Sequence, residues 1–373
     1  MTKKSALISG SGIAGATAAY WLARSGWNVT VVEKADAVRS SGNPIDVRGD
    51  AAAVVREMGV WPRLRAAATR VDRLEVVDSG GGARVTIDTR QTADLEQEVE
   101  VPRADLAAAL LAAARDEAEV IVGDVITGLE QDRHGIDATF NTGAPGRFDL
   151  VIGADGLHSG VRRIAFGPES DFASPFGMFV GTMHTRIASG DPRALQLFNR
   201  PGVSLSIHPG AGSPLAAFIF RSDRVYDRHD PEAHKRLVRD AYTGQGWVSD
   251  QAVAEWLATD DVYFDAVTRI AMPAWTAGRI TLLGDAADCI SLLGEGSSNA
   301  IVAAKTLADA IAKHPSDVPS ALSAYERRHR ARVRAFHRRA RRNSHWLVPT
   351  TSPGIAFRNA SMRVATMFQA VRK

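Results

Sequence analysis

The chain has 373 residues, of which 45% are hydrophobic, 23% charged and 7% aromatic. This length suits two domains or one large discontinuous domain, and this composition excludes fibrous and disordered proteins. The net charge of +3 hides an uneven distribution, because nine arginines and no acidic residue lie between Arg327 and Arg342. Such a block can bind nucleic acid, but no base-stacking motif accompanies it and the remaining chain is net acidic. We expect instead a solvated helix with Val333 and Phe336 packed inward, and no nucleic-acid partner.

A single cysteine, Cys289, excludes a disulfide framework, a paired-thiol redox centre and a multi-thiolate metal site. We expect a buried structural thiol and no metal. The chain starts with a basic and then apolar order that resembles a signal peptide, but Gly10, Gly12 and Gly15 interrupt the apolar part. No stretch approaches the roughly eighteen apolar residues of a membrane-spanning helix, so we predict a cytoplasmic protein without membrane contact.

The first forty residues predict a strand, a tight turn, a helix and a second strand. Residues 6–8 are apolar, residues 16–23 have helical spacing, and the β-branched residues 29–32 end in Glu33. The turn between the first strand and the helix reads Gly10-Ser11-Gly12-Ile13-Ala14-Gly15. This order is the dinucleotide-binding βαβ unit, in which glycines allow a sharp turn, backbone approach to a pyrophosphate and close helix–strand packing.

The remaining chain predicts a discontinuous α/β fold. Apolar residues 150–152 and 279–283 each run into a Gly/Asp motif, as buried parallel strands with loops at their carboxyl ends do. Residues 171–265 alternate in polarity and predict an inserted, mainly antiparallel sheet, which strands within residues 71–101 join. We therefore expect a discontinuous Rossmann-like dinucleotide-binding domain (1–70, 102–170 and 266–345), an inserted-sheet domain (71–101 and 171–265) and a C-terminal helix (346–373).

In the first βαβ unit, the pyrophosphate would lie at the helix N-terminus, and Glu33 would bind the hydroxyls of an adenosine ribose. Asp155 and Asp285 each follow a strand and stand beside glycine, so they suit a second, more distal sugar or ribityl chain.

Taken in order, these motifs resemble those of the class A FAD-dependent monooxygenases of the para-hydroxybenzoate hydroxylase type. The resemblance covers most of the chain and includes the glycine fingerprint with Glu33, the segment 41–49, Arg103 in Val-Pro-Arg, Asp155-Gly156 and Gly284-Asp285. The stretch 263–285 is similar to the branch of the family that inactivates tetracycline and tailors polyketides, which implies a place in antibiotic biosynthesis or modification.

The resemblance implies a role for each matching position. The fingerprint residues hold the FAD pyrophosphate, Glu33 and its neighbour Lys34 the adenosine side, Arg103 the sugar or phosphate portion, and Asp285 the ribityl region. Asp155 serves FAD and NADPH binding, and Arg48 approaches the flavin ring or the substrate. The expected cofactor-binding residues are Gly10, Gly12, Ala14, Gly15, Glu33, Lys34, Arg48, Arg103, Asp155, Gly284, Asp285, Gly294 and Gly296.

The implied activity is hydroxylation of an aromatic or polyketide-like small molecule. In the family, NADPH or NADH reduces FAD, dioxygen forms a C4a-hydroperoxide on the flavin, and one oxygen atom passes to the substrate. Because the cofactor carries this chemistry, no catalytic side chain is assigned, with Arg48 the one candidate. A halogenase or reductase of the same fold, or a flavin-binding protein without catalysis, remains an alternative.

Two further expectations concern the substrate side. Met183, Phe220 and Arg221 lie in the inserted sheet and are candidate substrate contacts, although core packing explains the aromatic residue equally well. The loop after Asp285 departs from the family because it lacks a proline and contains Glu295. An inward-pointing acid at this position would disfavour the reduced, anionic flavin.

Overall fold

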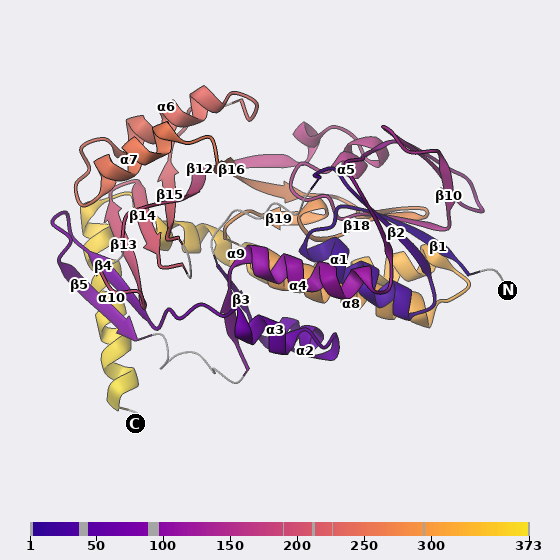
Figure 1. The fold of residues 1–373 in the computed structure, drawn as a ribbon, viewed down its shortest axis with the longest axis horizontal. Coiled ribbons are helices and arrows are strands. Elements are labelled where there is room, and N and C mark those ends of the chain that lie inside the picture. The colour runs from indigo at the N-terminus through magenta and orange to yellow at the C-terminus, as the bar shows by residue number, and fades with distance from the viewer. Residues whose placement is uncertain are drawn as a thin grey trace.

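The computed structural model describes residues 3–36, 44–88, 97–188, 190–210, 213–225, 227–293 and 295–371. The fold has two sheet-based parts that lie side by side, with the long C-terminal helices running behind and beside them (Figure 1).

The first part is built on a six-stranded sheet in which all neighbours are parallel except the edge pair β17–β18. The central strand β1 is buried, and its residues Ala6, Leu7 and Ile8 have no exposed surface. The predicted βαβ unit and both later parallel strands are confirmed. In spatial order the strands are β17 (Thr276–Ala277), β18 (Ile280–Leu282), β11 (Leu150–Gly153), β1 (Ser5–Ser9), β2 (Asn28–Glu33) and β7 (Glu119–Val122).

Helices cover this sheet. Helix α1 (Ile13–Arg24) packs against α4 (Arg103–Arg115) and α8 (Gly296–Lys313), and the three run together across the centre of Figure 1. Most of the buried residues of α1 are small, which lets α4 and α8 approach it closely. The shorter helices are α2 (Gly49–Glu57), α3 (Trp61–Ala66) and α5 (Gly160–Ala165), with two 3₁₀ turns, η2 (Glu169–Asp171) and η3 (Gly284–Ala286).

Two small sheets complete the first part, and the sequence did not predict either of them. One is a three-stranded antiparallel meander with largely exposed residues, and the other is a single antiparallel pair. The meander strands are β8 (Ile126–Gln131), β9 (Ile136–Phe140) and β10 (Gly146–Phe148), and the pair is β3 (Ile45–Val47) with β6 (Val99–Val101).

The second part is an eight-stranded sheet, which confirms the predicted inserted, mainly antiparallel sheet; we call it the substrate sheet after the role expected of it. Only the β13–β4 neighbours run parallel. Strands β4 and β5, from the early part of the chain, join the sheet as expected. In spatial order the strands are β19 (Asp288–Ile290), β16 (Val262–Ala271), β12 (Ala173–His184), β15 (Leu215–Arg221), β14 (Val203–His208), β13 (Ala194–Arg200), β4 (Arg73–Val77) and β5 (Ala83–Asp88).

The two faces of this sheet have different partners. Its outer face packs against α6 (Pro231–Tyr242) and α7 (Ser249–Ala258), where Phe218 and Trp256 belong to one buried apolar cluster. Its inner face packs against the loop after β19 and against α9 (Val318–Leu347), through Leu293 and Ala340. Helix α10 (Ser352–Val371) packs along β5 and β13.

The arginine-rich segment lies in α9. Val333 is buried as predicted, while the side chain of Phe336 lies outside the described residues. Arg330 pairs with Glu326 and Arg332 with Asp50. The other described arginines of the segment form an exposed face, so the helix is solvated: Arg327, Arg328, Arg334, Arg338, Arg339 and Arg342. Among the described helices, none combines the length and apolarity needed to cross a membrane.

Candidate functional site

The glycine-rich turn after β1 has the geometry of a pyrophosphate cradle. Gly10 has φ of +96°, and a Cβ there would stand 2.6 Å from the Ala154 carbonyl oxygen. A Cβ on Gly15 would overlap the Gly10 carbonyl oxygen, so this glycine permits the close contact between helix and turn. A Cβ on Gly12, in contrast, would meet no atom within 4 Å.

The N-terminus of α1 is left open toward that side. Gly12 is the N-cap residue, and no side chain caps the helix among the described residues. The first backbone N–H groups of an α-helix have no partner within the helix and carry the positive end of its dipole. An anionic group can therefore approach across Gly12, as the residues of an FAD pyrophosphate site require.

Glu33 stabilises the same turn from the end of β2. Its carboxylate accepts hydrogen bonds from the backbone N–H of Ser11 at 2.8 Å, the Ser11 hydroxyl at 2.9 Å and the backbone N–H of Ala35 at 3.0 Å. The side chain is half-buried and Lys34 beside it is exposed. Glu33 thus lies at the end of β2, as predicted, and its carboxylate is bound to the glycine-rich turn.

Asp155 follows β11 and is bound by the loop that it begins. Its carboxylate accepts hydrogen bonds from Ser9 at 3.3 Å, from the backbone N–H of Val161 at 3.0 Å, and from the Ser159 hydroxyl. Gly156 has φ of +80°. Asp155 therefore links the end of β1 to the start of α5 and determines the shape of the loop at residues 155–159, which we call the DG loop.

The turn at Gly284 and Asp285, which we call the GD turn, contacts the first motif directly. Gly284 has φ of +64°, and a Cβ there would stand 3.0 Å from the Cβ of Ala14. A Cβ on Gly296, at the start of α8, would stand 3.1 Å from Asp285 Oδ1. The structure therefore brings the GD turn together with the N-termini of α1 and α8.

Arg103 belongs to the same region. Its charge and that of Asp285 both act on the side chains of Tyr263 and Cys289. Burial is the largest effect on each of those two groups and raises the pKa of both. Cys289 is a buried free thiol, as predicted. The charges of Arg103 and Asp285 thus both reach Tyr263 on β16 and Cys289 on β19.

Glu295, the acid by which this loop departs from the family, forms an ion pair with Arg48. Arg48 Nη2 lies 2.5 Å from Glu295 Oε1, and 45% and 42% of their side-chain surfaces are exposed. Glu295 precedes α8 with φ of +51°, and the hydroxyl of Ser298 donates to the Asp46 carbonyl oxygen at 2.9 Å. The acid is therefore neutralised by Arg48 at the start of α8. Gly294 lies outside the described residues.

The three substrate candidates do not share one face. Met183 and Phe220 are buried in the apolar cluster beneath α6 and α7, on the outer face of the sheet. Arg221 points the other way, where it donates to the Val348 carbonyl oxygen at 2.9 Å and to the Ser344 hydroxyl at 3.3 Å. The structure therefore places only Arg221 on the inner face.

The inner face instead carries side chains that the sequence analysis did not select. In register across β16, β12, β15 and β14, its rows are Tyr263–Thr182–Ala217–Ser206 and Asp265–Val180–Ile219–Ser204. The hydroxyls of Thr182 and Ser204 are buried, and no partner for them is found among the described residues. Alternation along a strand predicts which residues share a face of the sheet. It does not predict which face is the inner one or which residues of neighbouring strands lie opposite each other, so these side chains could not be selected from the sequence.

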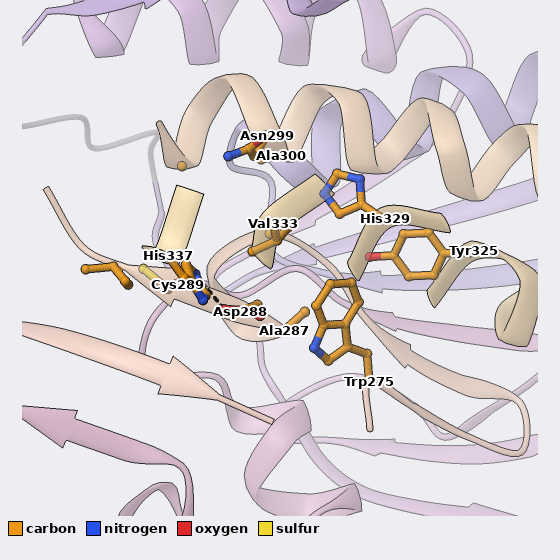
Figure 2. A pocket seen from close by; sticks show the side chains of 13 residues that line it. Trp275, Ala287, Asp288, Cys289, Asn299, Ala300, Tyr325, His329, Val333 and His337 are labelled. Carbon is orange, nitrogen blue, oxygen red and sulfur yellow. Dashed lines mark ion pairs between the residues drawn. The ribbon is translucent and has the colours of Figure 1, made fainter. Parts of the chain in front are cut away.

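A small cavity lies behind the GD turn, between α8, α9 and β19 (Figure 2). It measures about 20 Å³, enough for roughly one water. His337 Nε2 lies 2.9 Å from Asp288 Oδ1 at its edge. Burial and the nearby Arg332 lower the pKa of His329 to about 4, so this histidine is uncharged at neutral pH. The cavity is too small for a flavin. The residues that line it support the GD turn from behind.

Comparison with known proteins agrees with this geometry. The FAD binding domain family matches residues 3–340. An uncharacterised protein of Mycobacterium tuberculosis is 33% identical over 94% of both chains. A flavin-dependent monooxygenase of Legionella longbeachae is 33% identical over 81% of this chain and 79% of its own. The crystal structure of tetracycline destructase Tet(51) superposes with a TM-score of 0.85 at 25% identity, covering 98% of this chain and 97% of the other.

The two-part α/β fold, with an open α1 N-terminus, an acid at the end of β2 and two aspartate motifs, is the fold of the flavin-dependent oxidoreductases. The chain belongs to the FAD binding domain family and is an FAD-dependent monooxygenase of class A.

The GD turn leads to a direct prediction. Replacing Asp285 with alanine is expected to raise the FAD dissociation constant about tenfold, the usual effect of losing one or two hydrogen bonds to a charged group. The side chain is half-buried, so the midpoint of unfolding without FAD should change little. Quenching of flavin fluorescence on titration measures the constant. An unchanged constant would remove Asp285 from the site.

Proposed function

We propose that this protein uses NADPH or NADH to reduce bound FAD and then hydroxylates an aromatic or polyketide-like small molecule. The observation that carries the proposal is the open N-terminus of α1 next to the GD turn, which in turn faces the inner side of the substrate sheet. The similarity to a tetracycline destructase supports a polycyclic, oxygen-rich substrate.

The residues present suit FAD along its whole length. The N–H groups of the first turn of α1 would bind the pyrophosphate, Glu33 the adenosine ribose, and Asp285 with Arg103 the ribityl and phosphate portion. When bound, FAD supplies the activation of dioxygen. The N-terminus of α8 adds a positive dipole end beside the GD turn, where negative charge is stabilised. Arg48 offsets the charge of Glu295 at that helix end.

The substrate would lie on the inner face of the second sheet. Val180, Ile219 and Leu293 make part of this face apolar and exclude water from it. The hydroxyls of Thr182 and Ser204 are available to bind the oxygen atoms of a substrate, because buried hydroxyls favour a partner. Met183 and Phe220 support this face from behind, and Arg221 fixes it to the end of α9.

The test is an anaerobic titration of the purified protein with NADPH, followed by air, with the visible spectrum recorded throughout. We expect the yellow flavin bands to bleach with NADPH and to return in air. Bands that NADPH does not bleach, with or without aromatic substrates, would point to an external reductase or a flavin protein without catalysis. A colourless protein that FAD does not reconstitute would contradict the flavin site itself.

A further inference from the structure

A histidine in the DG loop bridges the two parts of the fold. His158 Nδ1 lies 3.0 Å from Glu169 Oε1, and Nε2 lies 3.1 Å from Asp265 Oδ2. Glu169 belongs to η2, which contacts β12, and it pairs with Arg162 of α5, whereas Asp265 lies on β16, on the inner face of the second sheet. Both ring nitrogens therefore face carboxylates, and the bond to Asp265 ties His158 and the DG loop to the second sheet.

The bridge continues to the GD turn through a buried arginine. Arg162 has no exposed side-chain surface, and its guanidinium donates to Glu169 at 2.8 Å, to the Leu157 carbonyl oxygen at 2.6 Å and to the Ala286 carbonyl oxygen at 3.2 Å. Ala286 is the last residue of the GD turn. A continuous polar chain thus runs from β16 through His158, Glu169 and Arg162 to the turn that carries Asp285.

We propose that His158 is a positioning residue, and that its imidazolium, held between Glu169 and Asp265, fixes the DG loop and the GD turn against the substrate sheet in the geometry that binds FAD. The proposal rests on the flavin site described above. His158 itself is not assigned a contact with the cofactor. It acts through the loop that starts at Asp155 and through the arginine that holds the GD turn.

The charges around the ring favour the protonated form. Glu169, Asp265 and the more distant Asp155 are acidic, and Arg162 is the basic group of the cluster. The hydrogen bond with Asp265 is the largest effect and raises the pKa of His158, against a smaller opposing effect of burial. A neutral imidazole has one N–H and can donate to only one of the two carboxylates, so deprotonation breaks the bridge at one end.

The direction of the pH dependence follows from this raised pKa. The raised pKa belongs to the FAD-free protein, so the protonated, bridged form of His158 persists above the ordinary histidine value, near 6.5, and is lost as the pH rises through the raised value. FAD should therefore bind most tightly below the raised pKa and more weakly as the pH rises through it. Cys289 and Tyr263 do not interfere, because burial raises the pKa of both groups.

The experiment measures the FAD dissociation constant from pH 6 to pH 9 for the wild type, His158→Gln, Asp265→Asn and the double variant. At pH 6 each single variant should bind FAD about tenfold more weakly, the effect of one charged hydrogen bond. The pH dependence should vanish in His158→Gln, and the double variant should be no weaker than the singles because both remove the same interaction.

Two controls separate this role from general damage. Asp260→Asn removes an ion pair with Lys235 on the outside of the substrate part, and His337→Gln removes the other histidine–aspartate pair near the GD turn. Both should retain the wild-type pH dependence.

Three results would overturn the proposal: additive losses in the double variant, an Asp265→Asn variant with wild-type affinity and pH profile, or a lower unfolding midpoint with unchanged FAD binding. Absence of FAD binding by the wild type would instead overturn the flavin site first.

Discussion

Replacing Gly12 with valine is expected to weaken FAD binding strongly and to leave the chain folded. The position has φ of −65° and an extended ψ, which a β-branched residue adopts, and a Cβ there meets no protein atom within 4 Å. The added side chain would thus occupy the space through which a pyrophosphate reaches the N–H groups of α1. We expect the FAD dissociation constant to rise on the order of a hundredfold, measured by fluorescence titration.

The matched control is Gly15→Ala, three residues further along the same turn. Its Cβ would overlap the Gly10 carbonyl oxygen, so the backbone between β1 and α1 must shift. This smaller change should lower the unfolding midpoint even without FAD, while Gly12→Val should not. Full FAD content in purified Gly12→Val, or equal destabilisation by both changes, would show that the open side of the turn is not the binding side.

The Arg162→Met substitution is expected to destabilise the chain by about 3 kcal/mol. It removes the donors to two carbonyl oxygens and to Glu169 from a fully buried position. Breaking a buried charged pair usually costs about 3–5 kcal/mol, and we take the lower end because Glu169 is 36% exposed and can be hydrated. Urea unfolding of the FAD-free protein, followed by circular dichroism, measures the loss.

The neighbouring Arg163 provides the control for that change. It lies on the same helix but is exposed, so Arg163→Met should alter the free energy of unfolding by less than about 0.5 kcal/mol. Equal effects of the two substitutions would mean that the polar chain through Arg162 adds nothing beyond the helix itself.

Local chemistry explains which parts of this site the sequence predicted. Gly10, Gly15 and Glu33 lie within one βαβ unit, where spacing along the chain fixes spacing in space. The GD turn was predictable for the same reason, because an apolar strand ends at a glycine and an acid. Each of these features depends on backbone geometry that a short stretch of sequence determines.

The parts that were not predicted depend on contacts between distant segments. The Arg48–Glu295 pair and the His158–Asp265 bridge join residues more than a hundred positions apart, and no periodicity relates them. Alternation along the strands does not show that Met183 and Phe220 lie on the outer face of the sheet. Only the placement of α6 and α7 decides which face is the outer one. The meander of β8 to β10 was not predicted because its strands are short and bury only Ile126, Ile136 and Ala138, which gives a weak apolar pattern.

Strand β19 gives the fold a built-in mechanical constraint. It begins only three residues after Asp285, and it pairs with β16 from Asp288 opposite Ala271 to Ile290 opposite Arg269. The GD turn thus leads directly into an edge strand of the other sheet. Pulling the two sheets apart would have to break this ladder, so the pairing of β19 with β16 couples the GD turn mechanically to the second sheet.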